Sequence, residues 1–559
     1  MADNIKRSWY KEMAVYQIWP RSFCDGNGDG IGDLKGVLSK LDYIKSLGVD
    51  AIWFSPLYKS PQKDFGYDIA DYRSIQPEYG TLEDFKAVLD GAHERGMRVI
   101  MDLVVNHTSD QHEWFLESKK GDDNPYHDYY FWRKGRGKLK PNNWMSTFGG
   151  DAWEYDENLD EYYLHLFAKE QPDLNMDNPK VREEVKDIMR FWLDMGVDGF
   201  REDVITFISK DEGLPMSPYF FPLGTGIEHY MHGPHLDEYL MEFKNDVLSK
   251  YDCMTVGEAP MMTPEKALKH IAEGDNQELN MMFHFQHMEA DCLFNVWVRR
   301  PFDLKKLKRV YTNWQTKLYG KGWNALYIEN HDQPRIVSRY GSERFRVESA
   351  KMLAVMYMCQ SGTPFIYQGQ EIAMTNCPLD DINDYVDVST INVYNIVKKI
   401  VGEKKALKMA HYASRDNART VVQWSDRKNA GFTTAEKPWF TVNPNYTTIN
   451  VASQEDDPDS VLNFYRKLIK FRKENDIVIY GSYKEHDHAR NDLYAYSRYL
   501  DDKKMLVVCS FSDKNVRFDA PEGFELSEGK LVLANYSPCG VVNNSFTLRP
   551  YETRVYLWE

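Results

Sequence analysis

The stretches MRVIMDLVV (97–105) and VDGFRED (197–203) are the third and fourth of eight short apolar runs that alternate with stretches of helical pattern. A capping box at Thr81 and Asp84 predicts the start of one such helix, and apolar residues from Leu34 to Leu47 predict another that ends at Gly48. Strands that alternate with helices pair in parallel, and eight such units close a barrel. The sequence therefore predicts an α/β fold with a (β/α)8 TIM barrel. The eight runs are 13–20, 49–56, 97–105, 197–203, 253–259, 278–285, 324–331 and 363–370.

Two departures from this alternation predict two further domains. Residues 106–175, between the third and fourth strands, are too long for a loop and predict an inserted small α+β domain. Short alternating runs such as LYAYSRYL (493–500) predict a C-terminal antiparallel β domain over 482–559. We expect the barrel to span 1–105 and 176–481, including a polar subdomain around 371–455.

Composition excludes several classes of function. The 559 residues carry a formal net charge of −16, which argues against duplex nucleic acid and anionic membranes as partners. The best apolar run, 352–359, is far shorter than the roughly 20 residues that span a bilayer, and the N-terminal text does not read as a secretory signal. Seven scattered cysteines without a CxxC pair indicate reduced thiols. We therefore expect a cytoplasmic protein.

Three carboxylates stand at the carboxyl ends of separate predicted strands: Asp203, Glu258 and Asp332. In (β/α)8 barrels, polar residues at these ends face the active site. Glycoside hydrolysis needs a carboxylic acid that protonates the leaving oxygen and a carboxylate that attacks or activates water. A lone carboxylate is more often a cap or a surface charge, but three at one barrel mouth favour a glycosidase. Their basic and imidazole neighbours are Arg201, His107 and His331.

Five segments, in order, resemble the signature segments of the α-amylase family of glycoside hydrolases. Three longer segments are most similar to the oligo-1,6-glucosidase, or isomaltase, members of that family: AVYQIWPRSFCDGNGDGIGDLKG (14–36), FGYDIADY (65–72) and RDNARTVVQW (415–424). The signature segments are DLVVNHTS (102–109), QPDLN (171–175), GFREDVI (199–205), VGEAP (256–260) and ENHDQPR (329–335).

The resemblance implies a role for each carboxylate. Asp203 would be the nucleophile that forms a covalent glucosyl intermediate, Glu258 the general acid/base, and Asp332 the carboxylate that holds the sugar 2- and 3-hydroxyls. This is a retaining mechanism, for which the two reacting carboxyl groups lie about 5–5.5 Å apart. The resemblance also implies a glucose site formed by Asp64, Tyr67, His107, Phe148, Arg201, His331 and Arg419, with Asp64 and Arg419 on O4 and Tyr67 as the stacking platform.

The residue after the expected nucleophile bears on linkage. In relatives, Val at this position accompanies α-1,6 bonds, whereas Ala or Thr accompanies α-1,4 bonds or broader use; this sequence has Val204. The resemblance therefore implies an exo-acting α-glucosidase that releases glucose from the nonreducing end of α-1,6-linked isomalto-oligosaccharides. Because one methyl or hydroxyl group is worth only about 1–3 kcal/mol, we expect the preference to be partial.

Glu202 departs from the family pattern, which usually has an apolar residue between the Arg and the Asp. Strand alternation turns Glu202 away from Arg201 and Asp203, toward the surrounding helices. Because buried carboxylates need partners, we expect Glu202 to form a structural ion pair.

The loop DGNGDGIGD (25–33) predicts a structural metal site. Oxygen ligands at every second residue of a Gly-rich loop suit a hard cation, and we expect Ca²⁺; no organic cofactor is expected. The loop is not an EF-hand, because Gly36 stands where a bidentate Glu is needed, and a metal-free Asx-turn loop is the alternative. The expected ligands are Asp25, Asn27, Asp29, the carbonyl of Ile31, and Asp33.

Other functions stay open within the same family. Dextran glucosidases share the Val, broad α-glucosidases are disfavoured by it, and trehalose-6-phosphate hydrolases would need a basic phosphate pocket that the sequence does not locate. Sucrose isomerases carry an arginine-rich RLDRD-type segment where this chain has QPRIVSRYGSE (333–343). An inactive binding or transporter-subunit homologue would lack the three carboxylates. The expected partners are small oligosaccharides, and we expect a monomer.

Overall fold

The computed structural model describes residues 6–137, 139–220, 225–293, 295–537, 540–541 and 543–559. Its centre is an eight-stranded parallel sheet in the order β11-β10-β9-β5-β2-β1-β15-β14. A parallel bridge between Met282 and Asn324 joins the two outer strands, so the sheet closes on itself. Each of the eight predicted runs contains one strand of this barrel, which confirms the predicted fold class. The strands are β1 (Val15–Ile18), β2 (Ala51–Phe54), β5 (Arg98–Leu103), β9 (Gly199–Glu202), β10 (Met254–Glu258), β11 (Met281–Phe283), β14 (Ala325–Leu326) and β15 (Thr363–Tyr367).

Helices between the strands follow the helical patterns of the sequence, with one exception. The capping box of Thr81 and Asp84 opens α4 (Leu82–Glu94), as predicted. The predicted single helix from Leu34 to Leu47 is wrong: α2 (Leu34–Leu38) and α3 (Leu41–Ser46) are separate. Ser39 donates a hydrogen bond to the Gly36 carbonyl, and Lys40 lies outside the helical region at φ −112° and ψ 3°. The Ser39 hydroxyl thus competes with the helical hydrogen bonds. The other main barrel helices are α6 (Pro179–Met195), α8 (Leu236–Asp246), α9 (Pro264–Ile271), α10 (Leu304–Leu318), α12 (Arg346–Met358) and α17 (Val461–Glu474).

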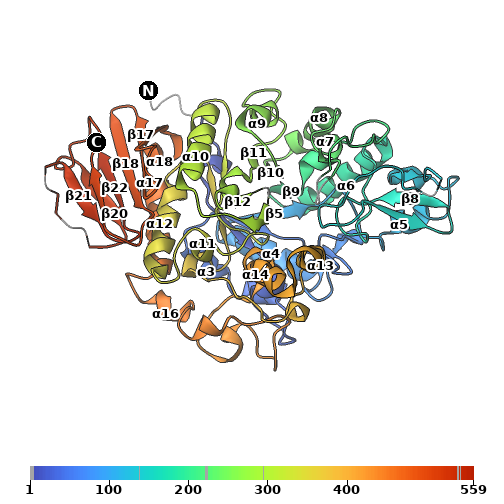
Figure 1. The fold of residues 1–559 in the computed structure, drawn as a ribbon, viewed down its shortest axis with the longest axis horizontal. Coiled ribbons are helices and arrows are strands. Elements are labelled where there is room, and N and C mark those ends of the chain that lie inside the picture. The colour runs from blue at the N-terminus through green and yellow to red at the C-terminus, as the bar shows by residue number, and fades with distance from the viewer. Residues whose placement is uncertain (1–5, 138, 221–224, 294, 538–539, 542) are drawn as a thin grey trace.

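The insertion between β5 and β9 forms a small sheet with short helices. Its strands pair in the order β6-β8-β7, and it lies at the opposite end of the molecule from the C-terminal sheet (Figure 1). Lys210 joins it to the barrel: its ammonium group lies 2.9 Å from Asp173 and donates to Asn106 over 2.8 Å. The elements are α5 (Glu113–Ser118), η3 (His127–Tyr129), β6 (Trp132–Arg133), β7 (Trp153–Asp156) and β8 (Glu161–Leu164).

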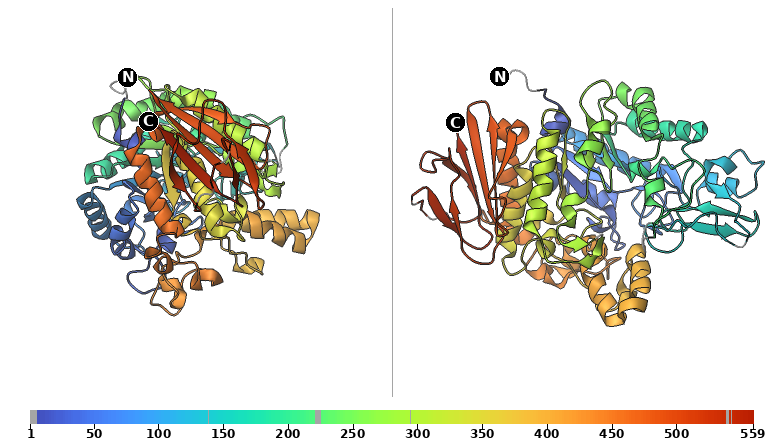
Figure 2. Two further views of the ribbon diagram at one scale, coloured as in Figure 1. Left: turned by 90° about the vertical axis from the view of Figure 1, so that its left-hand side faces the viewer. Right: turned by 45° about the horizontal axis from the view of Figure 1, so that its top comes forward.

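The polar region after β15 contains more helix than the sequence analysis anticipated. The helices α13 (Val388–Val401) and α14 (Glu403–Ala413) project from the side of the barrel (Figure 2). The next short helix, α15 (Asp416–Arg419), returns the chain to the barrel mouth. This excursion brings the two arginines at 415 and 419 to the carboxyl ends of the strands.

The C-terminal region is antiparallel, as predicted, with a five-stranded sheet in the order β16-β17-β18-β22-β20 and a two-stranded sheet β19-β21. The exact domain boundaries given above stay a prediction. Among the described residues, no helix combines the length and apolar character needed to cross a bilayer. The strands are β16 (Ser482–His486), β17 (Leu493–Leu500), β18 (Lys503–Ser510), β19 (Val516–Asp519), β20 (Lys530–Ala534), β21 (Ser545–Leu548) and β22 (Thr553–Trp558).

Candidate active site

Arg201, on β9, binds three acidic side chains at the barrel mouth. One nitrogen, Nη1, donates to Asp102 over 2.8 Å and to Asp203 over 2.6 Å, and Nη2 donates to Glu258 over 2.5 Å. These residues come from the ends of β5, β9 and β10, which are neighbours in the sheet. We call Asp102, Asp203 and Glu258 the first carboxylate group. Because a single guanidinium binds both Asp203 and Glu258, these two carboxyl groups face the same small space.

Val204 holds a strained backbone beside the first carboxylate group. Its φ of 35° and ψ of 40° are left-handed, a conformation that is an outlier for a β-branched residue. The turn aims the Val204 N–H at Glu258, with a nitrogen to oxygen distance of 3.2 Å. The side chain belongs to a buried apolar cluster that also contains Trp144 and other aromatic residues of the insertion. The strain therefore fixes both an acidic side chain and the wall beside it.

Asp332 lies at the end of the seventh strand run and is bound by an imidazole and a guanidinium. His331 Nε2 is 3.0 Å from Asp332 Oδ2, and Arg419 donates to Asp332 Oδ1 over 2.8 Å. The His331 ring stacks on Tyr67 with 5.5 Å between ring centroids and 7° between planes. The Tyr67 hydroxyl donates to Asp102 over 3.0 Å, which links Asp332 to the first carboxylate group.

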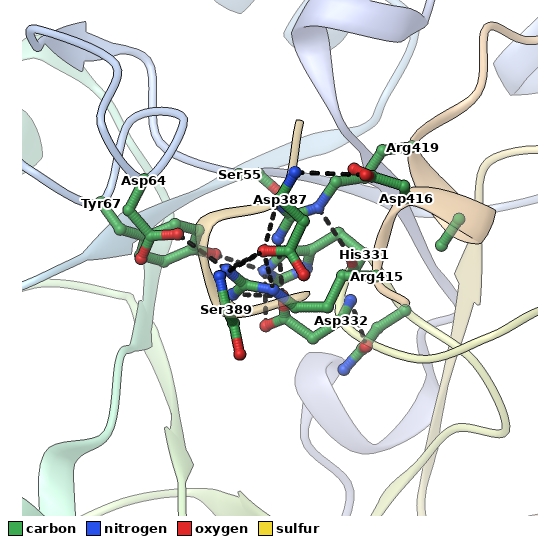
Figure 3. Close-up of polar contacts among 12 residues, drawn as sticks. Ser55, Asp64, Tyr67, His331, Asp332, Asp387, Ser389, Arg415, Asp416 and Arg419 are labelled. Atoms are coloured by element: carbon green, nitrogen blue, oxygen red, sulfur yellow. Dashed lines mark hydrogen bonds and ion pairs between the residues drawn. The ribbon is translucent and has the colours of Figure 1, made fainter. Parts of the chain in front are cut away.

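Arg415 lies between three further carboxylates (Figure 3). It donates to Asp64 over 2.9 Å, to Asp387 over 2.6 Å and to Asp332 over 3.2 Å. We call Asp64, Asp332 and Asp387 the second carboxylate group; it is served by Arg415 and Arg419. The guanidinium of Arg419 is buried over Trp19, 4.6 Å from the ring centroid.

Phe148 and His107 complete the cluster of predicted residues. Arg415 lies 5.0 Å from the centroid of the Phe148 ring, close enough for a cation–π contact. His107 Nε2 lies 3.1 Å from Gln171 Nε2, and Gln171 also donates to Asp64 over 3.2 Å. Burial lowers the pKa of His107 to about 4, so its ring is neutral near neutral pH.

The pKa shifts separate Asp203 of the first group from Asp332 and Asp387 of the second, whereas burial raises the pKa of Asp64 despite Arg415 and Arg419. In the first, burial raises the pKa of Asp203 well above its usual range; Arg201 opposes this, and the negative charges of Glu258 and Asp102 reinforce it. In the second, burial favours the neutral form of Asp332, but His331, Arg415 and Arg419 outweigh it and hold the pKa well below its usual range. Arg415 also outweighs burial at Asp387 and lowers its pKa. The surroundings of Asp203 thus favour its protonated form, and those of Asp332 and Asp387 favour the ionised form.

The ion pair expected for Glu202 is wrong. Glu202 is 1% exposed, and its Oε2 atom has no hydrogen-bond partner within the described parts of the chain. Burial raises its pKa to about 8. The side chain is therefore protonated near neutral pH, which is how a buried carboxyl group avoids the cost of an unpaired charge.

The loop 25–33 is held by bonds from its own backbone. Asp25 accepts from the N–H groups of Asn27, Gly28 and Gly30, and Asp33 accepts from Gly26, Asn27 and Gly36. Asp29 accepts from the N–H of Ile31. Its three carboxylates are not among the groups of three acidic or imidazole side chains that gather within 4.8 Å in the described residues. The oxygen ligands of the loop suit a hard cation, and its backbone hydrogen bonds suit the alternative of a metal-free Asx-turn loop.

The structure brings all the predicted catalytic and sugar-binding residues to one mouth. Sequence reasoning missed the part played by Asp387, Arg415 and Gln171 in holding the site together. Asp64 binds Arg415 and Arg419 binds Asp332, and the expected binding of Asp64 and Arg419 to the sugar O4 stays a prediction. The segment RDNARTVVQW carried both arginines, so the signal was present. Only the path of α15 determines which arginine reaches which carboxylate.

Comparisons with known proteins agree with this arrangement. The alpha-amylase catalytic domain family matches residues 17–481. The chain is 50% identical to the oligo-1,6-glucosidase of Parageobacillus thermoglucosidasius, over 99% of each chain. Among solved structures it is similar to the trehalose-6-phosphate hydrolase of Bacillus licheniformis, at a TM-score of 0.93 and 45% identity over 99% of this chain and 100% of that one. It is also similar to the isomaltulose synthase of Protaminobacter rubrum, at a TM-score of 0.93 and 42% identity with the same coverage. The chain belongs to the alpha-amylase family of glycoside hydrolases.

Proposed function

We propose that this enzyme is a retaining, exo-acting α-glucosidase that releases glucose from the nonreducing end of α-1,6-linked isomalto-oligosaccharides. The observation that carries the proposal is the guanidinium of Arg201, which binds Asp203 and Glu258 at once. Two carboxyl groups held this way can act on opposite ends of one glycosidic bond. The name of the 50% identical relative, oligo-1,6-glucosidase, supports the linkage.

The first carboxylate group would carry the bond-breaking steps. Glu258 would donate a proton to the glycosidic oxygen, while an oxygen of the ionised Asp203 attacks the anomeric carbon and the leaving sugar departs. The ionised Glu258 then takes a proton from water, the water oxygen attacks the anomeric carbon, and the bond to Asp203 breaks. Two displacements restore the configuration and release glucose.

The second carboxylate group would bind the glucose hydroxyls. Asp332 is ionised and keeps 26% of its side chain exposed, so it can accept hydrogen bonds from two sugar hydroxyls. Asp64 and Arg419 would bind O4, and Tyr67 would stack on the sugar ring. His107, Phe148 and His331 would line the same site. Arg415 occupies the space between Asp64 and Asp332, so we expect glucose binding to weaken one of its ion pairs.

Val204 supports the α-1,6 preference. Its strained turn holds the backbone N–H on Glu258, and we expect its branched side chain to face the leaving sugar. A change of one methyl group there alters the fit of the leaving sugar by about 1–3 kcal/mol.

Glucose release from a panel of substrates tests the function. The panel contains isomaltose, isomaltotriose, dextran, maltose, sucrose and trehalose-6-phosphate. We expect the highest kcat/KM for isomaltose or isomaltotriose. Preference for maltose, or no cleavage of any α-1,6 sugar, would overturn the proposal. Preference for trehalose-6-phosphate, or conversion of sucrose to an isomer, would instead assign the activity named for one of the two solved relatives.

We also propose a structural Ca²⁺ held by Asp25, Asn27, Asp29, Ile31 and Asp33. The three carboxylates, one amide and one carbonyl of this loop support it, since Ca²⁺ prefers oxygen ligands. Addition of EDTA should lower the melting temperature, and Ca²⁺ should restore it. An unchanged melting temperature would rule the ion out.

We also propose that the enzyme is cytoplasmic and monomeric. The six described cysteines are unpaired, which agrees with a reducing compartment. Fractionation of cells and light scattering of the purified enzyme test these two points.

A further inference from the structure

We propose that the inserted domain binds a transition-metal dication of the zinc class through Asp122, His127 and Glu161. One ligand atom from each of the three side chains lies within 4.8 Å of the other two. His127 begins η3, Glu161 begins β8, and Asp122 lies in the loop before η3. This proposal uses neither the catalytic carboxylates nor the loop 25–33, and it does not depend on the proposed function.

A hydrogen bond at His127 Nδ1 leaves the other ring nitrogen, Nε2, free to bind a metal. His127 Nδ1 lies 2.9 Å from the carbonyl oxygen of Ser118, which can only accept, so Nδ1 carries a hydrogen. In the neutral ring, Nε2 then presents a lone pair. A backbone carbonyl bound to the second nitrogen is the usual companion of a metal-binding histidine.

The lone pair on His127 Nε2 faces the carboxylates of Asp122 and Glu161. Nε2 lies 3.4 Å from Glu161 Oε2 and 3.6 Å from Asp122 Oδ1, both longer than an ordinary hydrogen bond. Glu161 Oε2 is buried and finds no hydrogen-bond partner in the described parts of the chain, and Glu161 and His127 are each 8% exposed. Among the described residues, no lysine or arginine pairs with Asp122 or Glu161; the nearby Lys119 binds Asp156. A lone pair and two carboxylates repel one another unless a cation lies between them.

The spacing of these atoms fits a tetrahedral metal. Bonds of about 2.1 Å at tetrahedral angles place neighbouring ligand atoms ~3.4 Å apart. The two distances from His127 Nε2 match this edge closely. A nitrogen and two carboxylate oxygens suit Zn²⁺, whereas Ca²⁺ and Mg²⁺ prefer oxygen ligands alone. The exposed side of Asp122 leaves the fourth position to water.

Aromatic packing holds the imidazole in place before any metal arrives. His127 stacks on Trp132 with 5.5 Å between centroids and 15° between planes, and Trp132 stacks in turn on Phe115. A bound metal would tie the loop that follows α5 to the first residue of β8. The site is therefore a structural clamp on the insertion, at the end of the molecule opposite the C-terminal sheet (Figure 1).

A second triad of the same composition provides the control. His270, Glu278 and Asp237 also gather within 4.8 Å. Here His270 Nδ1 lies only 2.6 Å from Glu278 Oε2, so a proton already joins the ring to the carboxylate. The nitrogen that faces these carboxylates is a hydrogen-bond donor, and we do not expect it to bind the metal.

Zinc titration of the untagged, full-length enzyme tests the proposal. After removal of bound metal with EDTA and desalting, Zn²⁺ binding is measured by calorimetry near neutral pH in excess Ca²⁺, for wild type, His127→Gln, Glu161→Gln and His270→Gln. We expect wild type and His270→Gln to bind one more Zn²⁺ than the other two variants, or to bind it roughly 100-fold more tightly. Co²⁺ should produce a visible absorption band in the same two proteins only.

Several results would overturn the metal site. Absence of Zn²⁺ binding by wild type would mean that His127 is an imidazolium that serves both carboxylates. Equal binding by wild type and Glu161→Gln, or an equal loss in His270→Gln, would assign the metal elsewhere. If His127→Gln does not fold, the nearly isosteric Glu161→Gln decides alone. Retained glucosidase activity in both variants confirms that the barrel is intact.

Discussion

The two carboxylate groups at the barrel mouth differ in the number of cations that serve them. In the first, Arg201 alone binds three acidic side chains. In the second, Arg415 and Arg419 serve three, with His331 beside Asp332. The pKa of Asp203 is therefore raised, whereas the pKa values of Asp332 and Asp387 are lowered; Asp64, although beside Arg415, keeps a raised pKa because it is buried. Similar side chains at one mouth thus have different charge states, because the balance of neighbouring cations differs.

The two groups would have different tasks in a glycosidase. Acid catalysis needs a proton that can leave, and binding of sugar hydroxyls needs carboxylates that accept hydrogen bonds. Substitutions in or beside each group test this comparison.

Removal of the nucleophile should have the largest effect on turnover. Asp203→Asn keeps a similar shape beside Arg201 but cannot form the covalent intermediate, so we expect kcat to fall by roughly 10⁴–10⁶-fold. Glucose release measures the loss. A melting temperature close to that of wild type shows that the fold is intact. A residual activity within tenfold of wild type would contradict the assignment.

Removal of the proton donor should cost less, and the cost should depend on the leaving group. For Glu258→Gln we expect a loss of roughly 10²–10⁴-fold on isomaltose. The first displacement on an aryl glucoside with an acidic phenol should be much less affected, because that leaving group needs no proton. The initial burst of phenol release measures this step. An equal loss on both substrates would mean that Glu258 positions the substrate instead.

Removal of one cation from the second group tests why Asp332 is ionised. Arg415→Met leaves Asp332 with Arg419 and His331, so its pKa should rise and the acidic limb of the kcat/KM profile should move to higher pH. We expect kcat/KM at neutral pH to fall by roughly 10–100-fold. Arg427→Met, at an exposed position, is the matched control. An unshifted profile would show that Arg415 does not set the charge of Asp332.

A change beside the first group should alter linkage preference without removing activity. Val204→Ala should raise the ratio of maltose to isomaltose kcat/KM by about tenfold, since one side-chain contact is worth about 1–3 kcal/mol. The ratio is measured on the same enzyme preparation, so errors in active concentration cancel. Ile205→Val, one residue further along the chain, is the control. An unchanged ratio in Val204→Ala would separate this residue from linkage choice.

The smallest effect is expected from Glu202, which lies on β9 between members of the first group but faces away from them. Its pKa is raised from the ordinary 4.5 to about 8, so wild type is stable below the lower value and loses stability as pH rises through the upper one. Glu202→Gln removes this titration. The variant should melt a few degrees higher than wild type above pH 8 and by a smaller margin in acid. Parallel curves at all pH values would mean that Glu202 has a cation partner.

Most of the barrel could be predicted because strand order follows from short-range patterns. Eight apolar runs, each long enough for one buried strand, located all eight strands of the barrel. The break between α2 and α3 could not be predicted in this way, because it involves a hydrogen bond from the Ser39 side chain to the Gly36 carbonyl. The hairpin of α13 and α14 was also missed. The segment 371–455 around it is rich in Asn, Asp and Pro, and apolar residues of the hairpin pack in a small separate cluster that includes Val393 and Ala406.

The sequence by itself determined the family and predicted which residues carry the chemistry. Their positions follow from the ends of strands, and the signature segments name the family. Only the tertiary structure decided how those charges are shared: which arginine serves which carboxylate, that Glu202 Oε2 has no hydrogen-bond partner among the described residues, and that His127 faces Asp122 and Glu161. The physical reason is that residue types and spacing fix local geometry, whereas ion pairs, burial and pKa values depend on groups that are distant in the chain and meet only when it folds.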